Sequence, residues 1–186
     1  MYKIFIILFI FSANANAFIN IESFRGNSQT GLNTSAKILL NQQTGNTDKI
    51  IASGSSLNSY KESKNEYILM ANMKYGESFE EKDTENGNLH LRYTRELNTG
   101  HFGELYTQYE YDKFKALNSR KLLGLGYRYT AKYFNLGLGA FNEYEEIENR
   151  PNQKAIRGNC YVSSSIKNKT GLEFSTIVYL QPSLKR

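Results

Sequence analysis

The chain has 186 residues, a formal net charge of +5 and a mean hydropathy of −0.55. It contains 14 Tyr and 11 Phe but no Trp, and it has one cysteine. This length suits one domain, and a lone cysteine excludes a disulfide framework or a cysteine-based zinc site. The low hydropathy excludes a bundle of transmembrane helices, and the aromatic content excludes a disordered chain.

The first 17 residues have the pattern of a secretory signal peptide. A positive start at Lys3 precedes eight apolar residues, 4–11, and an Ala-x-Ala end at Ala15–Ala17. The apolar run is too short to span a bilayer. We therefore expect cleavage after Ala17 and export of residues 18–186 as one domain. An uncleaved N-terminal anchor helix is the alternative.

After this signal, apolar and polar residues alternate in runs of about ten. Leu89, Leu91 and Tyr93, for example, share one parity, and polar residues occupy the other. Successive side chains of a strand point to opposite faces, so each run predicts a strand with one apolar and one polar face. Phe18–Phe24 is a candidate for a further short strand. The nine predicted strands are 31–41, 48–60, 65–77, 87–97, 102–113, 119–130, 133–145, 154–166 and 171–181.

The predicted loops alternate in length along the chain. The long ones are 80–86, 114–118 and 146–153, and the tight ones are 98–100, 131–132 and 168–170. Transmembrane β-barrels alternate long outer loops with short periplasmic turns, and about ten tilted residues cross the hydrocarbon layer. The sequence therefore predicts an all-β, antiparallel, up-and-down outer-membrane β-barrel of about ten strands. A soluble periplasmic binding barrel or sandwich, with the apolar face as its core, is the alternative.

The polar faces of the predicted strands would line the lumen of such a barrel. Barrels of this size are largely filled by side chains, so we expect the opposite charges inside to pair with one another. A narrow passage for small ions is the alternative. The residues predicted to face the lumen are Arg92, Glu104, Gln108, Glu110, Arg120, Gly124, Gly126, Arg128, Gly137, Gly139, Glu143 and Glu145.

The hairpin around residues 131–132 gives a register prediction. A two-residue turn there places Gly126 opposite Gly137 and Arg120 opposite Glu143, which is a favourable charge pair. The four lumen glycines of this hairpin leave a thin patch of wall. We expect the patch to make room for a bulky side chain from the far wall or for a folded-in terminus.

The sequence predicts no catalytic, cofactor or metal site. His90 lies on the lumen parity and His101 in a turn, and neither has a serine and a carboxylate at a matching height, as an outer-membrane lipid hydrolase would require. That hydrolase remains the alternative from a different class. Phosphate-binding loops and metal-ligand spacings are missing from the sequence. The charge is too small and too interspersed to predict a nucleic-acid partner.

Several short motifs occur in an order and spacing that identify a family. They are Thr44–Asp48, Glu110–Phe114, Gly124-x-Gly126-x-Arg128-Tyr129, Gly137-x-Gly139 and Asn142–Glu145. In these motifs the chain resembles the YdiY-like family of salt-induced outer-membrane proteins, domain of unknown function 481. The resemblance implies a barrel in the outer membrane of a Gram-negative bacterium, with no assigned activity. Its role would be structural or a narrow passage, linked to salt or osmotic stress of the envelope.

The resemblance also implies partners for this chain. They are outer-membrane lipid and lipopolysaccharide, with the barrel-assembly machinery and periplasmic chaperones acting during export. The sequence departs from the family at its end, because it stops at Arg186 without the terminal aromatic strand of such proteins. Bacterial barrels have an even number of strands. We expect either Phe18–Phe24 to supply a tenth strand or the chain to be truncated at Arg186, and we favour truncation.

Overall fold

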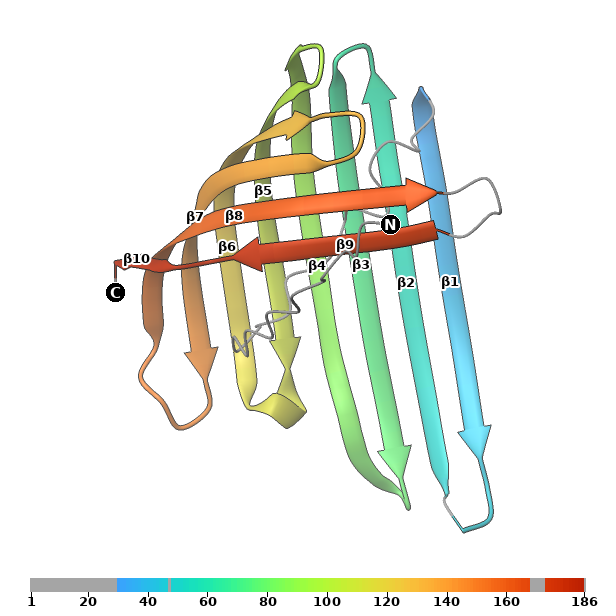
Figure 1. Cartoon of the computed structure of the whole chain (residues 1–186). Helices are drawn as coiled ribbons and strands as arrows, with labels where there is room; N and C mark the ends of the chain where they lie inside the picture. Colours follow the sequence, from blue (N-terminus) through green and yellow to red (C-terminus); the bar gives the residue numbers. More distant parts are fainter. Residues whose placement is uncertain (1–29, 47, 168–172, 186) are drawn as a thin grey trace, which may run out of the picture.

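The computed structural model describes residues 30–46, 48–167 and 173–185, so the predicted signal peptide and the predicted strand at 18–24 lie outside it. Within the described part, each strand up to β8 pairs with the next one along the chain, in one antiparallel sheet (Figure 1). The prediction of an all-β meander is thus confirmed. A short 3-10 helix, η2 (Lys113–Lys115), joins the fifth and sixth strands. The strands are β1 (Gly31–Gln43), β2 (Lys49–Glu62), β3 (Asn65–Ser78), β4 (Glu81–Asn98), β5 (His101–Asp112), β6 (Leu117–Thr130), β7 (Asn135–Ile147), β8 (Gln153–Lys167), β9 (Glu173–Leu180) and β10 (Ser183–Lys185).

The sheet is open, which corrects the predicted closed barrel. In the described residues, β1 pairs only with β2, and both β9 and β10 pair only with β8. β10 continues along the same edge of β8 as β9, after an interruption at Gln181 and Pro182. Pro182 accepts a 2.9 Å hydrogen bond from the amide of Gly158 through its carbonyl, but it has no amide hydrogen with which to continue the ladder. The ten strands therefore occupy nine positions across the sheet.

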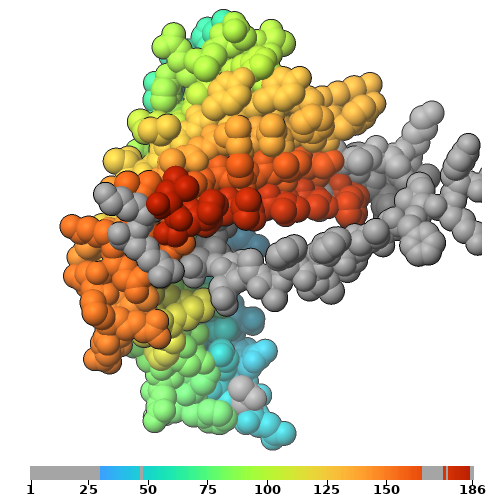
Figure 2. Space-filling model, turned by 60° about the vertical axis from the view of Figure 1, so that its left-hand side comes forward, coloured from blue at the N-terminus to red at the C-terminus, as the bar shows by residue number. Residues whose placement is uncertain are grey.

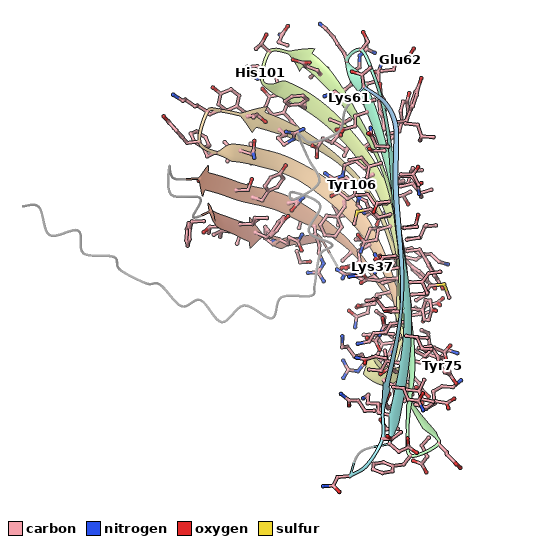
Figure 3. The ribbon with its side chains drawn as sticks, turned by 90° about the vertical axis from the view of Figure 1, so that its right-hand side faces the viewer. Lys37, Lys61, Glu62, Tyr75, His101 and Tyr106 are labelled. Carbon is pink, nitrogen blue, oxygen red and sulfur yellow. The ribbon has the colours of Figure 1, made fainter. Side chains whose placement is uncertain are left out.

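The sheet is strongly twisted and curved. In Figure 1, β8 and β9, coloured orange and red, run across the direction of β1 to β3, and in Figure 2 the red atoms of β9 form a band across the molecule. Figure 3 views the sheet from its edge, with Tyr106 on the concave side and Tyr75 on the opposite side. Twist accumulates from strand to strand because each strand has the same right-handed preference. The meander therefore has one concave and one convex face.

The two faces differ in polarity. Large apolar side chains of the convex face are exposed, with Leu125 at 65% and Leu138 at 49%. Charged side chains of the concave face are buried, with Arg92 at 3% and Glu143 at 3%. The soluble alternative expects the apolar face to form a core, but the convex leucines are not packed into a core within the described residues. The concave face also buries two small apolar clusters, which are Ile68 with Met70, and Tyr106 with Leu122 and Phe141.

The hairpin of β3 and β4 is longer than predicted. Residues 81–86 belong to β4, and the turn consists of Phe79 and Glu80, both with positive φ. The pairing register shifts beside Asp83, whose carboxylate accepts hydrogen bonds from the side chains of Lys49 at 2.7 Å, Ser78 at 2.5 Å and Thr84 at 2.9 Å. These contacts allow a charged segment to pair as a strand, so the prediction of a long loop at 80–86 is wrong.

The hairpin of β6 and β7 has the predicted faces but a different register. Its connection, residues 131–134, has four residues and is closed by a 2.8 Å backbone hydrogen bond between the first and the last. A shift of two residues keeps every side chain on its face, so the prediction is wrong in register but not in parity. Gly126 pairs with Gly139 rather than Gly137, and Arg120 pairs with Glu145 rather than Glu143.

Candidate functional site on the concave face

The residues predicted to face a lumen share the concave face of β4 to β7. The glycines among them are buried at 124 and 137 and half-buried at 126 and 139. Glu110 and Glu145 are half-buried near the end of the sheet that carries η2. Whether the concave face encloses a lumen stays a prediction, because the sheet is open. The other predicted residues are all at most 8% exposed, and they are Arg92, Glu104, Gln108, Arg120, Arg128 and Glu143.

A first ion cluster joins β5, β6, β7 and β8. Arg120 donates to Glu143 at 2.6 Å and to Glu110 at 2.9 Å. The second oxygen of Glu143 accepts from Arg157 of β8. Arg120 and Glu143 are almost wholly buried, whereas the side chain of Arg157 is 27% exposed. Glu143 of β7 therefore pairs with two guanidinium groups, one from each of its neighbouring strands, β6 and β8.

A second ion cluster joins β4, β5 and β6 on the same face. Glu104 accepts a 2.7 Å hydrogen bond from Arg92 and a 2.9 Å hydrogen bond from Arg128. Arg128 donates further to the hydroxyl of Thr130 at 2.9 Å. Its guanidinium carbon lies 4.1 Å from the ring centroid of Phe102, which adds a cation–π contact. One carboxylate again bridges two arginines.

His90 connects the two clusters. Its Nδ1 lies 3.1 Å from the side-chain oxygen of Gln108, and its Nε2 accepts from Arg92 at 3.4 Å. Because Nε2 accepts, the proton of the neutral ring belongs on Nδ1, which donates to Gln108. Gln108 in turn donates to Glu110 at 2.9 Å. A chain of hydrogen bonds, which we call the concave network, thus runs from Arg157 on β8 through β4 to Thr130 on β6.

The charges of the concave network nearly cancel. It contains four arginines and three glutamates, with one bridging histidine. Burying an isolated charge costs several kcal/mol, and a pair offsets that cost only when its remaining hydrogen-bonding groups are also satisfied. Glu104 and Glu143 meet this condition, because each carboxylate oxygen accepts a hydrogen bond from a different arginine. The network can therefore cross-link five strands in a poorly hydrated space, and it leaves one surplus positive charge.

Aromatic rings cover two of the predicted glycines. A Cβ placed on Gly124 would lie 2.3 Å from the ring of Tyr106, and a Cβ on Gly137 would lie 1.9 Å from the ring of Tyr161. Both rings come from the directly paired residue of the adjacent strand, on β5 and β8. At these two positions neighbouring strands supply the bulk, so the expectation of a side chain from the far wall is wrong there. The N-terminal segment that could supply a folded-in terminus lies outside the described residues.

The histidines have partners other than those of a hydrolase. Both ring nitrogens of His90 are engaged by Gln108 and Arg92, and Nδ1 of His101 pairs with the hydroxyl of Tyr127. A serine relay needs a hydroxyl on one nitrogen and an orienting acid on the other. Among the residues that the structure describes, no group of three or more His, Cys, Asp or Glu side chains is placed to hold a metal ion.

Some residues of the site are missing from the sequence prediction. Tyr106, Tyr161 and Phe102 cover glycines or arginines, and Asn159 and Ser163 of β8 are buried polar residues of the same face. The alternation within each strand already placed them on the polar parity. Only the correct pairing register, which sets Tyr106 against Gly124 and Tyr161 against Gly137, would have shown their role.

A separate charged cluster lies at the far end of the β3–β4 hairpin. Hydrogen bonds from Lys49, Ser78 and Thr84 lower the pKa of Asp83 to about 2. Hydrogen bonds from Lys113 and Lys82 likewise lower the pKa of Glu85. These ion pairs are solvent-exposed, and they fasten the extension of β4 to β2 and to η2.

The chain was compared with known proteins. Neither a curated protein nor a solved structure matches it. A family model described as "Protein of unknown function, DUF481" matches residues 36–185. That match spans β2 to β9 completely and includes the residues of the concave network. The resemblance seen in the sequence is thereby confirmed, and the chain belongs to the DUF481 family.

Proposed function

We propose that this protein is an integral outer-membrane β-protein with a structural role, whose convex face contacts lipid and whose concave face is filled by paired charges. The observation that supports the proposal most strongly is the reversed polarity of the sheet. Leu123, Leu125 and Leu138 are exposed on the convex face, whereas arginines and glutamates are buried on the other. In a bilayer the convex side chains leave water and contact acyl chains, which gains about 25 cal/mol per Å² of apolar surface.

The dimensions of the strands support this proposal. A tilted transmembrane strand needs about 9–11 residues, and β6 and β7 have 14 and 13. On β6 the convex positions Leu123, Leu125, Tyr127 and Tyr129 form an apolar stretch that ends in two tyrosines. Tyrosine is enriched where hydrocarbon meets the headgroups. The proposal requires the outer edges of β1 and β9 to be paired in the bilayer, since unpaired backbone groups are not tolerated there.

The concave network favours a structural role over an ion passage. Each of its carboxylates already accepts from a buried arginine or glutamine, so a permeating ion would have to break such pairs. The proposal includes export through a cleaved segment at residues 1–17. It also includes contact with outer-membrane lipid and lipopolysaccharide, with the barrel-assembly machinery and periplasmic chaperones acting during export.

A pair of single-tryptophan variants tests the proposal. The chain has no Trp, so Leu125→Trp and Phe141→Trp each introduce one reporter. The two positions lie at nearly the same level on opposite faces, since Leu125 pairs with Ala140 beside Phe141. In vesicles of phosphatidylcholine brominated on its acyl chains, we expect strong quenching of Leu125→Trp and weak quenching of Phe141→Trp. Equal weak quenching of both, with native-like circular dichroism, would contradict the proposal.

Extraction of bacterial envelopes separates the proposal from the soluble alternative. We expect the protein to stay with the membrane in sodium carbonate at high pH and to require detergent for release. Release by carbonate or salt would instead favour a periplasmic protein. Reconstituted in a planar bilayer, the protein should be silent, because the concave network occupies the space through which ions would move. Regular conductance steps would instead favour a narrow passage for small ions.

A further inference from the structure

Two lysines flank one tyrosine on the convex face, at the end of the sheet near η2. Lys121 of β6 pairs with Tyr144 of β7, and Tyr144 pairs with Lys154 of β8, so the three form a row across neighbouring strands. The ammonium nitrogens lie 5.8 Å and 5.7 Å from the centroid of the Tyr144 ring. Both lysines are exposed. We call this row the lysine clamp.

A shallow groove of about 550 Å³ lies at the lysine clamp. Besides the clamp residues it is lined by Thr107, Leu122, Leu123, Asn142 and Glu143. Asn142 and Leu123 pair with each other one row further from η2, so an amide group and an apolar side chain lie next to the two ammonium groups. The groove therefore offers cations at one end and an apolar wall at the other.

The lysine clamp differs from four other lysines near this end of the sheet. Lys49, Lys82, Lys113 and Lys115 each form an ion pair with a carboxylate. Within the described ranges, neither Lys121 nor Lys154 forms one.

Two carboxylates lie close to the clamp, but both have other donors. Glu143 accepts from Arg120 and Arg157, and Glu146 accepts from Ser119 at 2.8 Å and from Tyr144 at 2.9 Å. The charge of Lys121 also acts on Glu146. Neither Lys121 nor Lys154 is within ion-pair distance of a carboxylate in the described residues, so both ammonium groups can still contact an anion from outside the chain.

The height of the clamp matches the level of lipid headgroups under the proposed function. The apolar stretch of β6 begins at Leu123, directly after Lys121, and ends at Tyr129. The eight residue steps from Lys121 to Tyr129 span about 27 Å along the strand, or roughly 20 Å across the membrane at a tilt of about 40°. An apolar band of a transmembrane barrel is about 25 Å tall. Lys121 and Lys154 thus lie at one edge of the band, where a lipid phosphate would be.

We propose that the lysine clamp binds the phosphate group of an anionic lipid, with an acyl chain of that lipid on Leu123 and Leu125. Lysine binds phosphate as a point charge, and two ammonium groups can contact different oxygens of one phosphate. The ring of Tyr144 between them keeps both cations at the convex surface. This inference rests on the proposed function, because it requires the convex face to lie in a bilayer.

Brominated lipids measure this selectivity with Leu125→Trp as the reporter. The variant is reconstituted in vesicles in which either phosphatidic acid or phosphatidylcholine carries the bromine atoms, at equal mole fractions. An excess of quenching by brominated phosphatidic acid measures enrichment of the phosphate lipid beside β6. A lysine near an anionic surface contributes roughly fivefold, so we expect clear enrichment and its loss when Lys121→Gln and Lys154→Gln are combined.

The control is Lys132→Gln, at the opposite end of the sheet. Lys132 also lies over a tyrosine ring, 5.1 Å from the centroid of Tyr133, but it has no second lysine in its row, and the change should leave the enrichment intact. Equal quenching by both lipids, or enrichment that survives the double change, would overturn the proposal. Displacement of the lipid by millimolar inorganic phosphate would assign the clamp to a free anion and would also overturn it.

The same vesicles separate this inference from the proposed function. Quenching by brominated phosphatidylcholine reports only contact with lipid, so it should persist in the double lysine variant. Persistent quenching without enrichment would overturn the lysine clamp and leave the membrane proposal standing. Loss of all quenching in the parent reporter would overturn both.

Discussion

Glu143 is the residue whose loss should destabilise the concave network most clearly. Glu143→Gln keeps the size of the side chain but removes the charge that faces Arg120 and Arg157. Breaking a buried pair by removing one partner costs about 3–5 kcal/mol, because the other charge remains buried. Arg120 keeps Glu110, and Arg157 is 27% exposed and can turn to water. We therefore expect a loss near the low end, about 3 kcal/mol of unfolding free energy.

The assay is equilibrium unfolding of the full chain in lipid vesicles with urea, followed by far-ultraviolet circular dichroism. Glu145→Gln is the matched control, because Glu145 lies two residues further on the same strand and face, half-buried, and forms no ion pair within the described residues. Its change should stay below about 1 kcal/mol. In a double-mutant cycle with Arg157→Gln, the combined loss should be smaller than the sum of the single losses. Equal losses for Glu143→Gln and Glu145→Gln would refute the role given to the network.

Three further predictions concern other parts of the sheet. Gly137→Ala should destabilise the protein by about 1–3 kcal/mol because its Cβ would meet the ring of Tyr161, whereas Gly54→Ala, which has open space, should be neutral or stabilising in the same urea titration. The pKa of Asp83 is about 2, below its ordinary 3.8. Ionised Asp83 therefore stabilises the β3–β4 tip fully above pH 3.8, and this stabilisation is lost as the pH falls through 2. Hydrogen exchange at the β3–β4 tip of the parent chain should therefore accelerate as the pH falls through that range. In Asp83→Asn, exchange corrected for its intrinsic pH dependence should not change over the same range. Cys160 pairs with Leu138 on the convex parity, so a charged maleimide should label it slowly in vesicles and faster in urea. Rapid labelling in vesicles would place the convex face of β8 in water.

Much of the fold follows from alternation in the sequence. The parity that separates Leu123 and Leu125 from Arg120 and Arg128 is a property of each strand alone, so it survives errors in pairing. For the same reason, the charged residues of the concave network on β4 to β7 could be predicted as a set. Their individual partners could not, because the four-residue connection at 131–134 moves the β6–β7 register by two residues.

Two features of the fold depend on contacts that alternation does not encode. Residues 81–86 are as polar as a loop, and the contacts that hold them in a strand, such as the hydrogen bonds that Asp83 accepts from Lys49 and Ser78, come from residues distant in the sequence or across the hairpin. Closure of the sheet depends on pairing between the first and last strands, and a pattern within each strand carries no information about such distant partners. The tyrosines that cover Gly124 and Gly137 were missed for the same reason, since their role depends on register.

The unequal cross-linking of the strands gives the sheet an uneven stiffness. Side chains of β4 to β8 are linked by the concave network. In the described part of the chain β1 has one neighbouring strand, and nearly all of its side chains are exposed on both faces. A lateral force on the sheet would therefore bend or separate β1 and β2 before it deformed the strands β4 to β8. The space beside the concave face can thus widen or narrow through movement of β1 and β2, without breaking an arginine–glutamate pair of the concave network.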